Sequence, residues 1–406
     1  MSAAHRNLMA KPFSIICLSP QDWGEALPTN RQQIMLRAAA RDHEVLFIET
    51  GYFLGRHLWR LLRNHGRRSL ARRLFRTEPV APRVRARKAL NIAPWGAKYG
   101  LPNKLNWTIT ARVLRAFVAS MPQPVVLWIY DPHGARMAGS CGEEFAVYDC
   151  VDDYVEQTTS RRRREFVAAC DRVAALRSRL VFATSRTMYE RQLLVNPATH
   201  LVPNAGDYGH FVQAADRSIA ASEVAELRRP VVGFAGNFLA SKVDFSLLEH
   251  VALTRREWTL LLIGPSTSET VGSLERITQM PNVHWLGPKP YAELPRYIAA
   301  FDVGLIPYVS NAYTRSCFPL KLYEYLAAGK PVVASGLPEL AGMEPDVSLV
   351  EGPDPFVRAV EDALARRSEA EQERRMQLAS RNSWETRTER LLGLVEGELE
   401  AREPAA

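Results

Sequence analysis

The chain has 406 residues and a net charge of +8, and its content of 47% hydrophobic and 24% charged residues is typical of a globular protein large enough for two α/β domains. No apolar run approaches the ~18 residues of a membrane-spanning helix, and the first eleven residues lack the apolar core of a secretory signal peptide. The five cysteines are scattered without a C-x-x-C pair, which argues against a disulfide framework or a zinc site and favours the reducing cytosol.

The first half of the chain alternates short apolar runs with helical stretches. Continuous apolar runs are typical of parallel strands that are covered on both faces. We expect strands at 13–18, 44–48, 125–130, 146–150, 180–183 and 200–202, and helices at 31–41, 105–119 and 161–176. This alternation predicts a doubly wound, Rossmann-like sheet.

One segment of this half is strongly basic. Residues 56–88 contain twelve Lys or Arg and one acid, a net charge of +11, so the rest of the chain sums to −3. Leucines and Trp59 lie among the arginines without forming one clean helical stripe. We expect the segment to contact an anionic membrane surface, at the inner face of the membrane. The alternatives are a solvated loop or a nucleic-acid site, and no known nucleic-acid-binding signature supports the second.

The strand pattern then restarts and predicts a second wound domain. Its strands are expected at 230–236, 259–264, 283–287, 303–307 and 331–334. We therefore predict an N-terminal domain over 1–205, a C-terminal domain over 206–380, and a C-terminal helix and tail over 381–406 that packs back on the first domain. Ligands of such folds bind beyond the carboxyl ends of the strands, so we expect a cleft between the two domains.

A helix after the strand 303–307 provides the most informative local pattern. Pro319 suits its first position, and Gly329 suits the residue just past its end. The free N–H groups at a helix start favour an anion, whereas Lys321 in the first turn opposes the helix dipole. Lys321 is therefore explained by a bound diphosphate, and Glu324, one turn deeper, by hydrogen bonds from ribose hydroxyls. The alternative is an exposed Lys–Glu pair.

Further contacts to the nucleotide-bearing ligand, which is the donor in the resemblance described below, are expected around this helix. Gly236 and Asn237 follow the first strand of the second domain, where glycine lets a backbone approach phosphate, although an ordinary turn explains them equally well. No D-x-D sequence occurs, so we expect neither a metal ion nor another cofactor, and Lys321 with the helix dipole would replace the metal. The remaining candidates for donor binding are Ser316, Cys317, Phe318, Leu320, Pro288 and Tyr308.

A second set of candidates, assigned to the acceptor by the resemblance described below, follows strands of the first domain. Asp152 and Asp153 form an acid pair after the strand 146–150, and we expect Asp153, or else Asp152, to act as a general base. The alternative is that Asp152 caps a helix. Trp23, Gly24 and Arg31 are expected to bind the acceptor, and His133 is both a further acceptor contact and a lower-ranked base.

These motifs together resemble the group 1 glycosyltransferases of the GT-B fold. The matching stretches are Asn282-Val-His-Trp-Leu-Gly-Pro288, Phe301-Asp-Val-Gly-Leu-Ile-Pro307, the run from Lys321 to Ala334, and Leu201-Val-Pro-Asn-Ala-Gly-Asp207 at the domain junction. The resemblance implies a nucleotide-diphosphate sugar in the second domain, with Glu324 on the ribose and Lys321 near the diphosphate. It also supports the region around Tyr148-Asp-Cys-Val-Asp-Asp153.

One position departs from the family pattern. Many retaining members have a second glutamate eight residues before the ribose one, where this chain has Ser316. The helix is also similar to that of inverting bacterial exopolysaccharide glucuronosyltransferases, so inversion and retention both stay open. We therefore predict transfer of a sugar, from a UDP-sugar in preference, to a saccharide or lipid-linked acceptor in polysaccharide or cell-surface glycan synthesis. The alternatives are a sugar-nucleotide epimerase of this fold and a non-catalytic protein that binds polyanions or membrane.

Overall fold

A computed structural model describes residues 12–24, 28–50, 76–89, 91–96, 98–366 and 368–402. The chain divides into two compact units. Unit 1 comprises the residues up to Ala183, Tyr189–Val202 and the residues from Thr388 onward, and unit 2 comprises Thr184–Met188 and Pro203–Arg387. Most of the basic segment predicted to meet a membrane, residues 56–75, lies outside the described residues.

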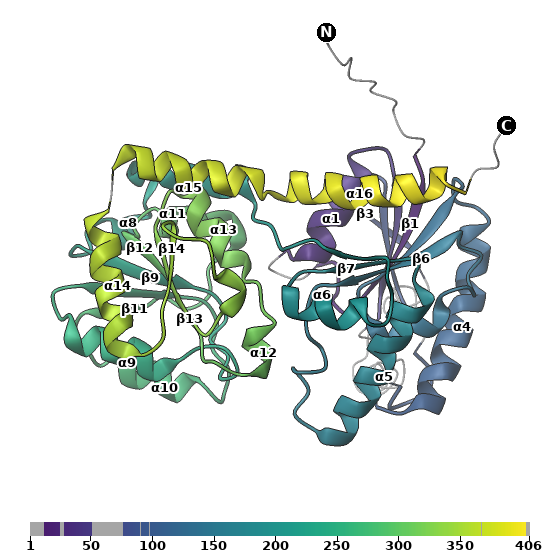
Figure 1. Ribbon diagram of the computed structural model, residues 1–406, viewed down its shortest axis with the longest axis horizontal. Helices are drawn as coiled ribbons and strands as arrows, with labels where there is room; N and C mark the ends of the chain where they lie inside the picture. The colour runs from purple at the N-terminus through teal and green to yellow at the C-terminus, as the bar shows by residue number, and fades with distance from the viewer. Residues whose placement is uncertain are drawn as a thin grey trace, which may run out of the picture. The chain divides into compact units, whose positions relative to one another are not determined.

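An eight-stranded sheet forms the centre of unit 1 (Figure 1). Its strand order is β3-β4-β2-β1-β5-β6-β7-β8, and all neighbouring strands are parallel except β3 and β4. The strands are β1 (Ser14–Ser19), β2 (Glu44–Glu49), β3 (Glu78–Ala81), β4 (Val84–Lys88), β5 (Val125–Ile129), β6 (Phe145–Cys150), β7 (Leu180–Ala183) and β8 (Thr199–Leu201). The doubly wound architecture is confirmed.

The hairpin β3–β4 was not expected from the sequence. Its second strand reads Val-Arg-Ala-Arg-Lys, and only Val84 and Ala86 of this strand are buried. Arginines alternate with these two residues near the edge of the sheet, where charged side chains reach solvent. Strand β4, between β2 and the edge strand β3, lacks the apolar run by which the central strands were recognised, and it was therefore read as part of the basic segment.

The helices of this unit are α1 (Asn30–Ala39), α4 (Gly100–Val118), the 3-10 helix η1 (Pro132–Met137), α5 (Arg161–Arg177) and α6 (Arg186–Leu193), which begins in residues of unit 2. Helix α4 begins five residues before the predicted start. Pro102 lies in its first turn, where a proline is tolerated because the N–H of that position needs no helical acceptor. Both α4 and α5 pack against η1.

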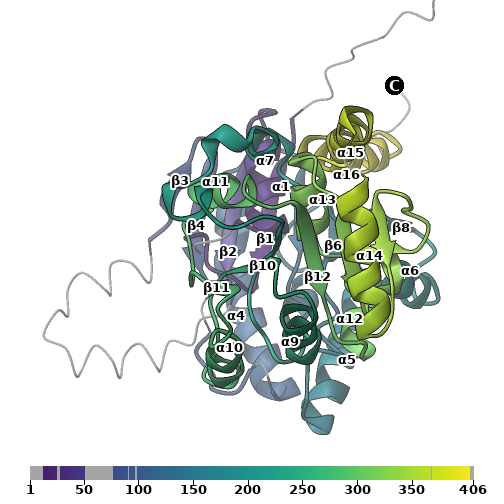
Figure 2. The same ribbon diagram turned by 90° about the vertical axis from the view of Figure 1, so that its left-hand side faces the viewer.

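Unit 2 contains a fully parallel six-stranded sheet with the order β11-β10-β9-β12-β13-β14. Its strands are β9 (Val231–Ala235), β10 (Thr259–Ile263), β11 (Val283–Trp285), β12 (Val303–Pro307), β13 (Val332–Ser335) and β14 (Val347–Leu349). Helices α9, α10 and α14 form one layer, and α11, α13 and α15 form the other (Figures 1 and 2). The second wound domain was predicted, but β14 was not, because its run of three residues is too short to stand out.

The helices of unit 2 are α7 (Tyr208–Phe211), α8 (Ser222–Ala225), α9 (Phe245–Thr254), α10 (Val271–Ile277), α11 (Leu294–Ile298), α12 (Ala312–Arg315), α13 (Leu320–Ala327), α14 (Pro353–Ala365) and α15 (Glu369–Arg381). Short 3-10 turns span Val212–Ala215, Arg217–Ile219, Tyr291–Glu293 and Pro338–Leu340. None of the described helices combines the length and apolar character that crossing a bilayer requires.

The last helix, α16 (Trp384–Glu400), starts in unit 2 and from Thr388 belongs to unit 1. Within unit 1 it buries Leu391, Leu392 and Val395. Arg41 and Arg179 pair with its Glu389 and Glu398, each at 2.6 Å. The apolar stripe and these flanking ion pairs fix the helix on the first unit.

Candidate donor and acceptor sites

The start of α13 is an uncapped helix N-terminus at the carboxyl edge of the unit 2 sheet. The helix begins at Leu320, with Pro319 as the N-cap residue, so the predicted position of the proline was wrong by one residue. No side chain caps the first turn. Gly329, with φ of 69°, follows the end of the helix as predicted. The first turn therefore presents backbone N–H groups that no side chain satisfies, together with the positive end of the helix dipole.

Lys321 extends from this first turn across Gly236 at the end of β9. A Cβ atom on Gly236 would lie 1.9 Å from Cε of Lys321, so only glycine leaves room for the lysine side chain there. The ammonium group also lies 5.8 Å from the ring centre of Phe234. From the sequence, an ordinary turn and a phosphate site explained Gly236 equally well, and the contact with Lys321 supplies a specific reason for the glycine. The cation is thereby held over the strand end.

Glu324 lies one turn deeper on α13 than Lys321. Its side chain is half-buried and poorly hydrated. Desolvation raises the pKa of its carboxyl group, the charge of Lys321 lowers it, and Asp207 raises it again, with a net increase. The chain at Gly206 passes so close to α13 that a Cβ there would lie 2.6 Å from Cβ of Tyr323. A carboxylate so placed gains from hydrogen-bond donors, such as the hydroxyls of a bound sugar.

The other predicted donor residues have mixed surroundings. Ser316 and Cys317 are buried in the turn that precedes α13, and Phe318 stacks on Tyr323 at 5.7 Å. Leu320 is half-buried, whereas Asn237 and Pro288 are exposed. Tyr308 is buried against Phe234 and lines a separate cavity of about 320 Å³. Around Lys321, the structure thus brings together Gly236, Glu324 and the turn 316–318.

The predicted acid pair of unit 1 is split between two different partners. Asp153 is 1% exposed, and its Oδ2 accepts a hydrogen bond from Arg191 at 2.8 Å. Its other oxygen accepts the N–H of Glu156 at 3.2 Å. Asp152 is more accessible and lies 3.7 Å from Arg31. The two carboxylates therefore do not form one site, and Asp153 is occupied by contacts that hold the turn 153–156.

His133 forms a dyad with an acid that sequence reasoning did not assign. Nδ1 of His133 lies 2.8 Å from Oδ1 of Asp131, and the hydroxyl of Thr50 donates to the other oxygen of Asp131. Nε2 of His133 is buried without a hydrogen-bond partner among the described residues. Burial lowers the pKa of His133, but the charge and hydrogen bond of Asp131 outweigh it and raise the pKa overall. The same contacts lower the pKa of Asp131 against its burial.

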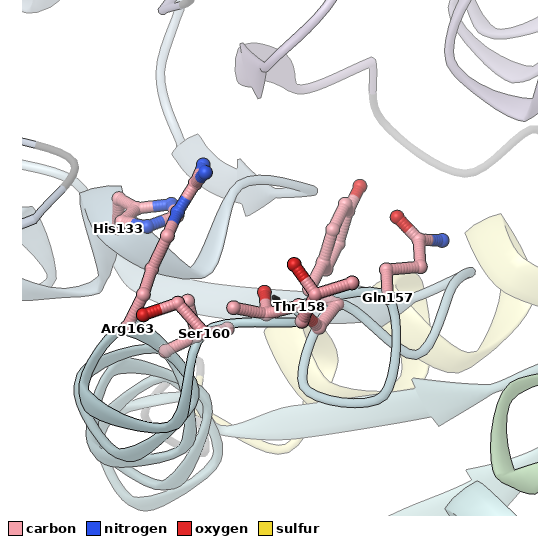
Figure 3. A pocket seen from close by; sticks show the side chains of 8 residues that line it. His133, Gln157, Thr158, Ser160 and Arg163 are labelled. Atoms are coloured by element: carbon pink, nitrogen blue, oxygen red, sulfur yellow. Dashed lines mark hydrogen bonds between the residues drawn. The ribbon is translucent and has the colours of Figure 1, made fainter. Parts of the chain in front are cut away.

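His133 lines a cavity of about 220 Å³ within unit 1 (Figure 3). The other lining residues are mostly hydroxyl, amide and guanidinium groups from the turn after β6 and the start of α5: Tyr154, Gln157, Thr158, Thr159, Ser160, Arg163 and Val167. Figure 3 shows the side chain of Arg163 beside that of His133, with Gln157 farther along the cavity. The cavity offers a proton acceptor, a cation and several hydroxyls to a polar ligand.

The remaining acceptor candidates lie around the start of α1. The ring of Trp23 packs edge-on against Phe47 at 5.0 Å, and its backbone N–H donates to Glu49 at 2.9 Å. Gly24 is exposed. Arg31 is 3% exposed and donates to the hydroxyl of Tyr154, a residue that also lines the His133 cavity. Arg31 therefore supports one wall of the cavity.

Two signals in the sequence were available for the missed residues. Asp131 precedes His133 by two positions after β5, and a short Asp-x-His turn lets the carboxylate reach the ring nitrogen. Arg163 is one of four consecutive arginines, 161–164, that open α5. Arginines in a first turn oppose the helix dipole, the same argument that singled out Lys321.

Comparison with known proteins gives matches to both the sequence and the fold. The family model described as glycosyl transferases group 1 matches residues 229–366. The putative teichuronic acid biosynthesis glycosyltransferase TuaH of Bacillus subtilis is 31% identical over 276 residues, which cover 64% of this chain and 68% of that protein.

Solved structures of similar fold include glycosyltransferases with various acceptors. Sucrose-phosphate synthase from Thermosynechococcus elongatus superposes with a TM-score of 0.67 at 17% identity, covering 96% of this chain and 100% of that one. HepE from Anabaena, in complex with UDP and glucose, gives a TM-score of 0.64 at 15% identity, covering 94% and 98% of the two chains. The similarity to these two structures shows the GT-B fold.

Proposed function

Since the chain belongs to the group 1 glycosyltransferases, a family with the GT-B fold and a role in glycan biosynthesis, we propose that unit 2 binds a nucleotide-diphosphate sugar and unit 1 binds the saccharide acceptor. The observation that supports the donor assignment best is the passage of Lys321 over Gly236 beside the uncapped start of α13. A lysine there opposes the helix dipole, and a bound diphosphate removes that conflict because it interacts favourably with both.

In this proposal the nucleotide lies along the start of α13. The diphosphate accepts hydrogen bonds from the first backbone N–H groups and from Lys321, and the ribose hydroxyls donate to Glu324. Lys321 and the helix dipole then stabilise the negative charge that develops on the leaving diphosphate. A UDP-sugar is the preferred donor, because the HepE structures of similar fold contain UDP, UDP with glucose, or UDP-glucose.

The acceptor hydroxyl is placed in the His133 cavity. Asp131 accepts a hydrogen bond from Nδ1–H, which leaves Nε2 of the neutral ring free to take a proton from the hydroxyl as its oxygen attacks the anomeric carbon. His133 thus replaces Asp153 as the proposed base, since Asp153 is engaged by Arg191. Asp152 remains the second choice because it is accessible. A general base that deprotonates the acceptor hydroxyl is required when the sugar is transferred by direct displacement with inversion of configuration.

A screen of nucleotide sugars tests the proposed reaction. Each compound is incubated with the full chain and with oligosaccharide or lipid-linked acceptors, and both nucleotide release and the glycosylated product are quantified. The proposal expects nucleotide diphosphate and product to appear in equal amounts. The anomeric configuration of the product, determined by NMR, distinguishes inversion from retention. Conversion of the donor into its epimer, with no acceptor modified, would contradict transfer.

A further inference from the structure

The described surface of unit 1 contains a concentrated group of exposed apolar side chains. Ten large hydrophobic residues are exposed in the described chain, and half of them lie within one short segment. We define the apolar patch by these five: Ile92, Trp95, Tyr99, Leu101 and Leu105, with exposed fractions of 47, 64, 41, 83 and 52%. Single exposed leucines are ordinary in soluble proteins, but grouped aromatic and aliphatic residues mark an interaction surface.

The backbone under the patch is held in place from below. Asn106 on the buried face of α4 accepts the N–H of Ala93 at 2.7 Å and donates to its carbonyl at 2.9 Å. Gly96 lies so close to this amide that a Cβ would be 2.5 Å from Nδ2 of Asn106. Trp95, between them, has a left-handed backbone with φ of 62°. A bulky residue rarely adopts this costly conformation, and here it coincides with an exposed indole.

Positive charge borders the patch. Lys98 and Lys104 are exposed within the same segment and have no acidic partner among the described residues. The guanidinium of Arg162 lies 5.0 Å from the ring centre of Tyr99, which places the four-arginine start of α5 against the patch. Arg161 and Arg164 are partly balanced by Glu165 and Glu156. The border of the apolar patch is therefore cationic.

We propose that the apolar patch and its cationic border dock unit 1 on an anionic lipid surface. Trp and Tyr favour the boundary between headgroups and acyl chains, the leucines insert among the chains, and the lysines and arginines attract acidic headgroups. The positive charge of the border favours an anionic lipid surface as the partner, because acidic headgroups attract lysine and arginine side chains. The arginine-rich segment 56–75 lies outside the described residues, and the proposal does not rest on it.

The patch adjoins the cavity that contains His133. The side chain of Asn103 on α4 donates to the carbonyl of His133 at 3.1 Å, and Arg163, next to Arg162, lines the cavity. Docking at the patch would therefore bring the cavity to the membrane surface, where a lipid-linked saccharide presents its sugar. This last step rests on the proposed function, whereas the docking itself does not.

The test is sedimentation of the full chain with lipid vesicles. We compare vesicles of phosphatidylcholine with vesicles that also contain phosphatidylglycerol, at low and high salt. The expected result is binding to the anionic vesicles that weakens at high salt, because screening reduces the attraction. Leu101→Ser with Leu105→Ser should reduce the apparent partition coefficient by about tenfold or more. Lys98→Glu with Lys104→Glu should abolish the preference for anionic lipid.

Matched controls separate the patch from exposure and charge in general. Leu194→Ser with Leu253→Ser removes two exposed leucines elsewhere, 90% and 51% exposed, and Arg256→Glu with Arg358→Glu reverses two exposed cations of unit 2. The first control should bind as the wild type does, and the second should keep the preference for anionic lipid. Folding of each variant is checked by thermal unfolding, and transfer to a water-soluble acceptor should be unchanged in the leucine variants.

Three outcomes would overturn the proposal. The first is a wild-type chain that fails to bind anionic vesicles. The second is unchanged binding by the Leu101→Ser/Leu105→Ser variant together with loss of binding when the arginines of 56–75 are neutralised. The third is a wild-type dimer by light scattering that the patch variant converts to a monomer, without vesicle binding, since the patch would then be an interface between two copies. A wild-type chain that binds anionic vesicles but transfers no sugar would contradict the proposed function instead.

Discussion

The two units place their cations differently, and the difference shows what each is built to bind. In unit 2, Lys321 lies over a glycine at a strand end, beside an uncapped helix start, and forms no ion pair with any described residue. In unit 1, Arg31 and Arg191 are committed to Tyr154, Asp152 and Asp153. A cation that is not held in an ion pair suits a ligand that is itself an anion, such as a diphosphate. Arg31, already paired, instead supports a wall of the His133 cavity, whose polar lining suits a saccharide.

Replacement of His133 by Gln should cause the largest loss of sugar transfer, and it should act through unit 1 only. The amide cannot accept a proton, so transfer should fall by about 10²–10⁴-fold while nucleotide binding is unchanged. Initial rates and a nucleotide titration measure the two quantities. His250→Gln, at an exposed ion pair of unit 2, serves as the control. Near-normal transfer by His133→Gln would remove the proposed base and favour Asp152 or a retaining mechanism.

Gly236→Ala should weaken nucleotide binding by unit 2 and leave unit 1 unaffected. The added methyl group would meet the side chain of Lys321, which must leave its position over the strand end. Because charge-assisted contacts contribute about 1.5–3 kcal/mol each, we expect nucleotide affinity to fall by about 10–100-fold. Isothermal titration with UDP measures this loss. Gly272→Ala, where the added methyl group meets nothing within 4 Å, is the matched control. Equal affinities of the two variants would contradict the role of the Gly236–Lys321 contact.

Asp131→Asn should alter the pH dependence of transfer. Asp131 raises the pKa of His133, so wild-type activity should decline as the pH falls through a value above the ordinary ~6.5. Without that charge, burial dominates and lowers the pKa, and the acid limb of the profile should move to lower pH. We also expect the plateau rate to fall roughly tenfold, because the ring loses its orientation. An acid limb that does not move would exclude His133 as the titrating group.

Asp153→Asn should have the smallest effect on transfer but a measurable one on stability. The change removes the carboxylate charge that pairs with Arg191 and caps the turn 153–156. Because the side chain of Arg191 is 35% exposed, water compensates part of the loss, and we expect about 1–2 kcal/mol of destabilisation. Chemical unfolding measures the change. Loss of transfer without loss of stability would return the role of base to Asp153.

The fold was largely predictable from the sequence because the central strands are apolar on both faces. The hairpin β3–β4 and the short β14 were not predicted, since a charged strand and a run of three residues lack that pattern. For the donor site, a conflict between Lys321 and its own helix dipole was visible in the sequence. For the acceptor site, Asp152 and Asp153 looked like a pair, yet their side chains reach different arginines. Adjacent positions in the chain cannot show which partner each side chain finds.

The most direct test of this account is the stabilisation of the chain by UDP in the wild type and in Lys321→Ala. UDP should raise the melting temperature of the wild type, and Lys321→Ala should lose most of this shift, whereas Arg358→Ala, at an exposed cation of α14, should retain it. The unliganded Lys321→Ala chain should be at least as stable as the wild type, because a cation opposing the helix dipole is removed. An undiminished shift by UDP in Lys321→Ala would contradict the placement of the diphosphate at the start of α13.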